Sequence, residues 1–215
     1  MIISNDLINK ANLSFEIKCL KVLIKSYNTS LSLKKYTKDW EEKTFSSHLV
    51  SLMKQCEIAV KYDLIITKEE ELEDEAIDNG LKSANEANPI DIRFHNIWQK
   101  LRFDYVIEAK NISNSRWQKS NLNNVNASQQ QTEYITKGVD RFLSGHFKDK
   151  KGCMVGYIVN GNLSDILNKI NDKFKNQSRV KENIYQVESK ELNCTIYNSK
   201  HKERDLKHLF FIYSN

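Results

Sequence analysis

The sequence is poor in the residues that interrupt regular structure or form cross-links. Its 215 residues include one proline, six glycines and four cysteines. The cysteines are scattered without a C-x-x-C pair, which argues against a zinc site or a disulfide framework and favours small reduced core residues. No apolar run approaches the roughly 18–20 residues of a membrane span, and the first residues lack a secretory signal pattern. We therefore expect a soluble, cytoplasmic protein with no membrane association.

The charge balance is only mildly basic. Lys and Arg number 33 and Asp and Glu number 28, which gives a formal net charge of +5. Such a charge permits binding to nucleic acid but does not argue for it alone. Hydrophobic residues make up 40% of the chain, which is enough for one core and excludes a disordered composition. With no internal repeat and no linker, residues 1–215 are expected to form a single domain.

The apolar spacing alternates between helical and strand patterns. It predicts helices over residues 13–27, 37–57, 129–143 (with Gly145 as a stop) and 163–174. It predicts strands over residues 59–67, 90–97, 103–109, 153–159, 192–197 and 209–213. Residues 68–88 are acidic and are expected to form an exposed helix or insert, and residues 111–127 a polar loop. This order indicates a mixed α/β domain in which the two strands after Pro89 form an antiparallel hairpin.

One short charged triplet stands out from five similar ones. Acid-x-Lys occurs six times in the chain, but only Glu108-Ala109-Lys110 closes an apolar strand. Burying two charges there without a purpose would be costly. Because side chains alternate along a strand, Glu108 and Lys110 point to the same face. Asp91 begins the preceding strand, so a hairpin could bring its carboxylate beside Glu108.

Two adjacent carboxylates repel each other unless a cation lies between them. Hard oxygen ligands select Mg²⁺ or Mn²⁺ rather than zinc. Lys110 could then orient a water molecule or hold a phosphate oxygen, which would complete a site for phosphodiester hydrolysis. The alternative is a strand-end pair of Glu108 and Lys110 that makes ordinary surface ion contacts. Asp104, on the same strand as Glu108, is an alternative to Asp91 as the second acid.

These motifs resemble a known superfamily. Residues 89–91 (PID) and 108–110 (EAK) resemble the signature of the PD-(D/E)xK, restriction-endonuclease-like nucleases. The resemblance implies a mixed central sheet flanked by helices, with the motif residues on a central hairpin. It further implies a metal-dependent nuclease in which Asp91 and Glu108 hold Mg²⁺ or Mn²⁺ and Lys110 positions the attacking water.

Two further parts of that superfamily have counterparts here. The resemblance implies a glutamate on the helix before the sheet; Glu42 is the first choice and Glu41 the second, while both could instead complement the helix dipole. It also implies a Q-x-x-x-Y motif on the helix after the second motif strand, matched by Gln130 and Tyr134. These two residues lie one turn apart and could line the substrate path, although a glutamine-rich stretch could produce the match by chance.

Other residues are candidates for contacts with nucleic acid. Arg141 lies at the end of the Tyr134 helix and could bind phosphate or pair with an acid. His201 and Arg204 belong to a basic segment, 199–208, which could grip a phosphate backbone or be a solvated turn. Residues 134–159 and 199–213 also resemble stretches of uncharacterised bacterial nuclease-like proteins, some of which are associated with phage defence.

The leading hypothesis is therefore a Mg²⁺- or Mn²⁺-dependent nuclease acting on nucleic acid, with DNA favoured. The first rival is a nuclease-fold subunit that binds DNA or assembles with a helicase or ATPase partner. The chain has no Walker motif, so ATP-driven activity would have to come from that partner. The second rival is an interaction protein whose strand-end charges are structural. The sequence leaves a homodimer open.

Overall fold

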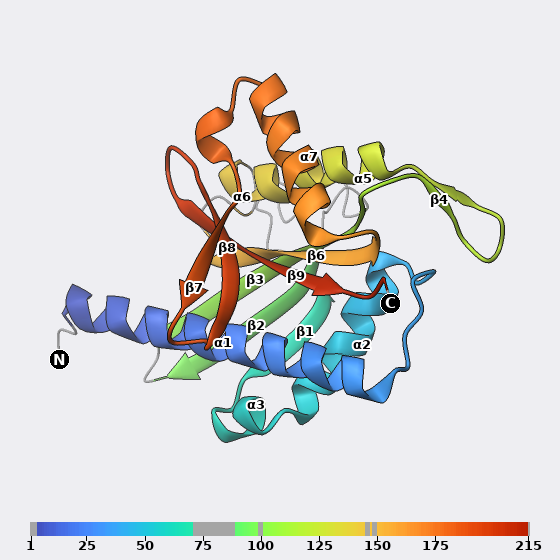
Figure 1. Ribbon diagram of the computed structural model, residues 1–215. Coiled ribbons are helices and arrows are strands. Elements are labelled where there is room, and N and C mark those ends of the chain that lie inside the picture. Colours follow the sequence, from blue (N-terminus) through green and yellow to red (C-terminus); the bar gives the residue numbers. More distant parts are fainter. Residues whose placement is uncertain (1–3, 71–88, 99–100, 145–146, 148–149, 215) are drawn as a thin grey trace, which may run out of the picture.

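A seven-stranded mixed sheet forms the middle layer of the molecule (Figure 1). The computed structural model describes residues 4–70, 89–98, 101–144, 147 and 150–214. The strands are β1 (Ile65–Glu70), β2 (Ile90–Trp98), β3 (Leu101–Ser113), β6 (Gly152–Asn160), β7 (Tyr185–Ser189), β8 (Cys194–Lys200) and β9 (Asp205–Ile212). Their order is β1-β2-β3-β6-β9-β8-β7; β3, β6 and β9 pair in parallel, and the other pairs are antiparallel.

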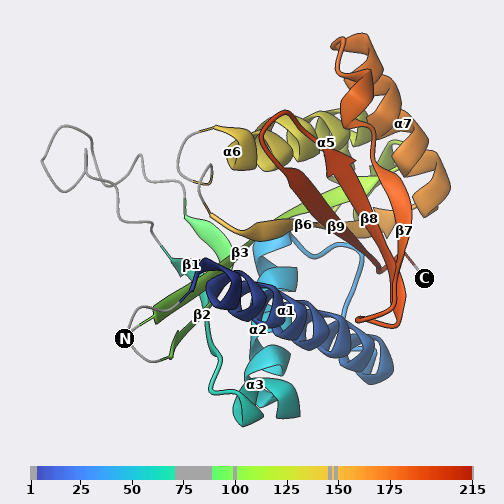
Figure 2. The same ribbon diagram turned by 90° about the vertical axis from the view of Figure 1, so that its left-hand side faces the viewer.

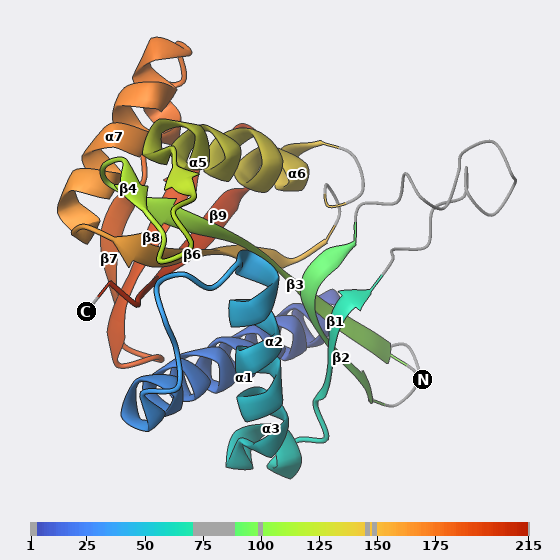
Figure 3. The same ribbon diagram turned by 90° about the vertical axis from the view of Figure 1, so that its right-hand side faces the viewer.

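Helices cover both faces of this sheet (Figures 2 and 3). They are α1 (Asn5–Leu33), α2 (Glu42–Gln55), α3 (Glu57–Lys61), α5 (Ala127–Tyr134), the π-helical turn η2 (Ile135–Val139), α6 (Asp140–Leu143), α7 (Leu163–Asn176) and the short 3₁₀ helix η4 (Val180–Glu182). The first three lie on one face, and α5, α6 and α7 lie on the other. The predicted mixed α/β class, with a mixed central sheet flanked by helices, is confirmed.

Two apolar clusters fill the spaces between these layers. On the α1–α2 side, the buried stripe of α1 includes Phe15, Cys19 and Leu23, which recur three to four residues apart as a helical face requires. On the other side, α7 contributes Ile166 and Ile170 at the same spacing. None of the helices in the described ranges combines the length and the apolarity needed to cross a lipid bilayer.

The predicted helix and strand boundaries need correction near the N-terminus. The first helix runs from Asn5 to Leu33 rather than over residues 13–27, and α2 begins at Glu42 rather than near residue 37. The strand predicted over residues 59–67 is wrong in its first half, because that stretch forms α3. A left-handed residue, Asp63 (φ 49°), follows α3, and the strand begins only at Ile65.

The largest error in the sequence prediction concerns residues 111–127. Instead of a loop, β3 continues to Ser113 because its pairing with β6 extends that far. The remainder contains a small antiparallel hairpin, β4 (Trp117–Gln118) and β5 (Asn124–Val125). Strand β7 was not predicted at all. Residues 68–70 of the predicted acidic segment belong to β1, and residues 71–88 lie outside the described residues. Gly145, the predicted helix stop, also lies outside them.

Gly152 is required where β6 begins against β3. A Cβ atom at this position would lie 2.1 Å from the backbone oxygen of Val106, and a backbone atom cannot move aside as a side chain can. We therefore expect Gly152→Ala to lower the free energy of unfolding by about 1–3 kcal/mol or more, measured by urea denaturation. Ser120→Ala, on an exposed turn, serves as the control. Equal stability of the two variants would contradict this packing.

Candidate active site

Three carboxylates surround one ammonium group near the centre of the sheet. Lys110 Nζ donates hydrogen bonds to Glu42 Oε1 at 3.0 Å and to Glu108 Oε1 at 2.7 Å. It also donates to the backbone oxygen of Ala109 at 2.7 Å, and Asp91 Oδ2 lies 3.8 Å away. The four residues that the sequence singled out for the chemistry are therefore together, although they come from three separate elements.

Asp91 and Glu108 meet because β2 and β3 separate at this point. The ladder between the two strands stops at the pair Ile92 and Ile107. Beyond it, the carboxylate of Asp91 accepts a hydrogen bond from the backbone N–H of Ala109 at 2.7 Å. The side chain thus replaces the backbone partner that β2 no longer supplies. Asp91 is held against the strand that carries Glu108 and Lys110.

The first turn of α2 supplies the third acid. Glu42 is the first residue of this helix and bonds to Lys110, whereas Glu41 is exposed and pairs with Lys119. Of the two glutamates considered, only Glu42 reaches the cluster. The alternative acid Asp104 lies elsewhere, in an ion pair with Arg93 at 2.7 Å.

A second cation reaches the cluster from the opposite helical layer. Arg141 Nη1 lies 2.7 Å from Glu108 Oε2, and Nη2 donates to the backbone oxygen of Pro89 at 3.2 Å. Arg141 belongs to α6, which follows the π-helical turn η2. In that turn a Cβ on Gly138 would lie 2.4 Å from Cε of Met154, so a larger residue there would displace the end of this methionine side chain. Such π turns are frequent at functional sites.

Burial and mutual charge shift the ionisation of the cluster. The side chain of Glu108 is only 1% exposed, and burial, together with the charge of Asp91, raises its pKa from 4.5 to about 7. Burial alone would lower the pKa of Lys110, but the charges of Glu108, Asp91 and Glu42 outweigh it and raise that pKa. Burial raises the pKa of Glu42, although Lys110 opposes the shift. The ammonium stays charged, while Glu108 titrates close to neutral pH.

The donor set is chemically suited to a hard divalent cation. Carboxylate and carbonyl oxygens are the ligands that Mg²⁺ and Mn²⁺ prefer, and the oxygens of Glu42, Glu108 and Ala109 already converge on one positive charge. Across the described part of the chain, however, no three His, Cys, Asp or Glu side chains are grouped as a metal site. Lys110 lies between the acids, so a divalent cation would compete with its ammonium for the same oxygens.

A polar cleft of about 340 Å³ opens beside the cluster. Glu42, Lys110 and Gln130 line it, so Gln130 lies where the sequence placed it, with Oε1 accepting a hydrogen bond from Ser113. Asn111 also lines the cleft. Its Nδ2 donates to the backbone oxygen of Trp40 at 2.8 Å, but its Oδ1 is buried with no hydrogen-bond partner in the described structure. Asn111 is not among the site residues predicted from the sequence, in which only its position after Lys110 marks it.

Tyr134 and His201 do not lie on this cleft, because both belong to a buried polar network. The hydroxyl of Tyr134, fully buried, bonds to His208 Nδ1 at 2.8 Å. Ser199 Oγ lies 2.7 Å from His208 Nε2 and 2.7 Å from His201 Nε2. His201 Nδ1 then lies 2.5 Å from Glu182 Oε2. Burial lowers the pKa of His208 to about 3, so this residue is neutral. The network holds β8 and β9 against α5.

Arg204 is likewise engaged within the chain. Its guanidinium donates to the backbone oxygen of Lys150 at 2.8 Å and lies over the ring of Phe142. The segment predicted as a basic loop is largely strand, since β8 continues to Lys200 and β9 begins at Asp205. Of the predicted nucleic-acid contacts, Arg141 alone is beside the cluster, and there it pairs with Glu108.

Comparisons of the chain with models of protein families, with curated proteins and with solved structures found no match. The function is therefore inferred from the residues of this chain and their geometry.

Proposed function

We propose that the protein is a metal-dependent nuclease that hydrolyses phosphodiester bonds of nucleic acid, with Glu42, Asp91, Glu108 and Lys110 as its catalytic cluster. The observation that carries this proposal is the convergence of three acids from separate elements on one lysine whose side chain is only 13% exposed. Such a concentration of charge is costly to bury and destabilising when incompletely paired. A catalytic role explains why it is retained beside an open polar cleft.

Asp91 and Glu108 would hold Mg²⁺ or Mn²⁺, with Glu42 assisting. When bound, the cation would polarise a phosphoryl oxygen and lower the pKa of a water molecule. Hydrolysis forms a bond between the water oxygen and phosphorus, breaks the bond to the leaving oxygen and transfers a proton to it. The three N–H donors of Lys110 bind Glu42, Glu108 and the Ala109 oxygen, so Lys110 would donate to the attacking water or to a phosphoryl oxygen only after the cation has taken its place at the acids. Arg141 fixes the orientation of Glu108 by binding its second oxygen.

The experiment that tests this function is a cleavage assay on plasmid, linear and single-stranded DNA and on RNA. The purified chain would be incubated with Mg²⁺, with Mn²⁺ or with EDTA, beside Asp91→Asn. We expect cleavage that requires the metal and that Asp91→Asn abolishes. Cleavage in EDTA, or undiminished cleavage by a folded Asp91→Asn variant, would contradict the proposal.

A second candidate function is a nuclease-fold subunit that binds nucleic acid and acts only with a helicase or ATPase partner. The observation that favours it is that both carboxylate oxygens of Glu108 already bind cations of the chain itself, Lys110 and Arg141. A metal ion would have to displace them. Under this alternative, the purified chain would bind nucleic acid without cutting any substrate. It would also gain no thermal stability from Mg²⁺ or Mn²⁺, whereas a true site should.

A further inference from the structure

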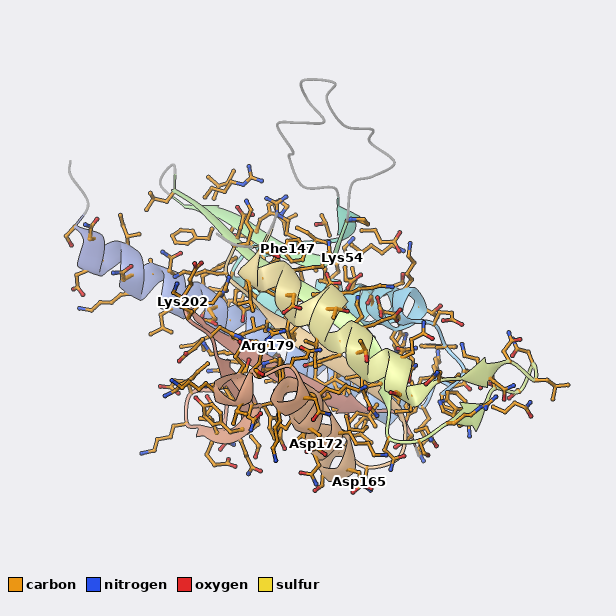
Figure 4. All side chains as sticks on the ribbon, turned by 90° about the horizontal axis from the view of Figure 1, so that it is seen from above. Lys54, Phe147, Asp165, Asp172, Arg179 and Lys202 are labelled. Atoms are coloured by element: carbon orange, nitrogen blue, oxygen red, sulfur yellow. The ribbon has the colours of Figure 1, made fainter. Side chains whose placement is uncertain are left out.

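The β4–β5 hairpin extends beyond the edge of the layered body (Figures 1 and 4). It leaves the end of β3, which carries Glu108 and Lys110, and returns into α5, which carries Gln130. The hairpin therefore connects two elements that line the candidate active-site cleft. Its own residues Asn123 and Asn124 line the same cleft.

The hairpin is fixed to the segment that positions Glu42. Lys119 forms an ion pair with Glu41, the residue before Glu42. The backbone N–H of Ser120 donates to Asp39 Oδ2 at 3.2 Å, and Lys38 lies over the ring of Trp117. A ligand that contacts the hairpin is thereby placed at a defined position relative to the catalytic cluster.

The tip of the hairpin presents an apolar side chain to solvent. Leu122 is 72% exposed, and its backbone has a left-handed conformation (φ 67°) that non-glycine residues adopt infrequently. The turn is held closed, since Leu122 N donates to the oxygen of Lys119 at 2.9 Å and Gln118 Nε2 donates to the oxygen of Leu122 at 3.0 Å.

Polar groups suited to nucleic acid surround this tip. The side-chain amides of Asn123 and Asn124 make no hydrogen bond within the described residues, and such amides can pair with base edges. On the other side of the hairpin, Arg116 is exposed and lines a second cleft of about 430 Å³ with Lys169, Asp172 and Lys173. The two lysines bond within the chain, Lys169 to the Asn114 backbone oxygen and Lys173 to the hydroxyls of Ser128 and Thr132. The exposed guanidinium of Arg116 is suited to a phosphate contact that orients a duplex.

We propose that the β4–β5 hairpin enters the major groove of duplex DNA, with Leu122 against the bases and Asn123 and Asn124 at base edges. The inference rests on the proposed nuclease function and specifies its substrate as duplex DNA. The major groove of B-form DNA is wide enough for a two-stranded β-ribbon. The major groove of duplex RNA is deep and too narrow for side chains to read. The hairpin therefore selects DNA over RNA and aligns one strand with the cleft.

The inference is tested by fluorescence anisotropy with a short labelled DNA duplex, the matching RNA duplex and single-stranded DNA, all in EDTA. The test variant is Leu122→Ala combined with Asn123→Ala. Ile97→Ala is the matched control, because Ile97 is 70% exposed near the turn of the separate β2–β3 hairpin. We expect the wild-type chain to bind duplex DNA at least about tenfold more tightly than duplex RNA. We expect the double variant to lose at least about tenfold in DNA affinity and the control to lose none.

Equal affinity of the double variant and the control for duplex DNA would overturn the inference. It would also be overturned if the wild-type chain bound the DNA and RNA duplexes equally, or bound single-stranded DNA more tightly than duplex DNA. Failure of the nuclease function has a different signature. If the wild-type chain cuts nothing while the hairpin variant loses DNA binding, the proposed function fails and the groove contact stands. If the hairpin variant cuts and binds duplex DNA as the wild type does, the inference fails and the nuclease stands.

Discussion

Replacing Lys110 by methionine should abolish nucleic-acid cleavage, with a loss of at least about a hundredfold in the single-turnover rate. Methionine keeps much of the aliphatic volume but removes the ammonium that Glu42, Glu108 and the Ala109 carbonyl bind. The water or phosphoryl oxygen would then lose its hydrogen-bond donor. Quantified cleavage products from wild-type and variant chains, each verified as folded by circular dichroism, give the comparison.

Lys137→Met is the matched control for this experiment. Lys137 lies in the π-helical turn, is exposed and pairs with Glu133 through a surface ion pair, so its loss should cost little. The Lys110→Met variant removes one of the two cations that the described residues place at the three acids, and we expect it to gain more thermal stability from Mg²⁺ than the wild type does. Full cleavage activity in Lys110→Met would exclude a catalytic role for this lysine.

The contribution of Glu108 to the stability of the metal-free protein should fall as the pH rises through the range in which this carboxyl titrates. Its pKa is raised from 4.5 to about 7 in the folded chain. Between these values the carboxyl binds more protons in the folded state than in the unfolded state, so its contribution to the free energy of unfolding decreases as the pH increases. The decrease amounts to about 3–4 kcal/mol at most, since one pKa unit corresponds to about 1.4 kcal/mol. His208, whose pKa burial lowers to about 3, contributes with the opposite sign, so the effect is read as the difference between the wild type and Glu108→Gln.

Urea unfolding at a series of pH values in EDTA measures this effect. The free energy of unfolding of the wild type minus that of Glu108→Gln should decrease as the pH rises between 4.5 and about 7, because the amide does not titrate. The pH dependence of Glu41→Gln, which changes an exposed neighbour of the cluster, should match that of the wild type. A constant difference between the wild type and Glu108→Gln would assign the titration to another group. A difference that increases with the pH over this range would contradict the raised pKa.

The main elements of the fold and the cluster could be predicted from the sequence because their signals are local. Helices such as α7 repeat apolar residues at helical spacing, and the β2–β3 hairpin follows from two short alternating runs. Period-two geometry places Glu108 and Lys110 on one face, and antiparallel pairing brings Asp91 to them. For the third acid, the sequence narrows the choice to two neighbouring residues, Glu41 and Glu42. The direction in which each side chain leaves the first helical turn decides between them, and the sequence does not give that direction.

The remaining features depend on tertiary partners that leave no local pattern. Strand β3 extends to Ser113 because β6 lies beside it, and the polar sequence there resembles a loop. Gln130 and Tyr134 are one turn apart, yet only Gln130 lines the cleft, because His208 on β9 covers Tyr134. His201 and Arg204 were predicted to contact nucleic acid, but in the fold they bond to Glu182 and to the Lys150 oxygen. These partners are distant in the sequence, so no local pattern indicates them.

The most direct test of a cation-dependent catalytic centre is single-turnover cleavage of a labelled DNA duplex at saturating Mg²⁺ by wild-type, Glu108→Gln and Glu191→Gln chains. Glu108 bonds to Lys110, whereas Glu191 is exposed in the turn between β7 and β8 and does not line the cleft. The catalytic cluster predicts that Glu108→Gln loses at least about a hundredfold in rate, while Glu191→Gln cuts as the wild type does. Equal cleavage by all three chains, or cleavage by the wild type that persists in EDTA, would contradict it.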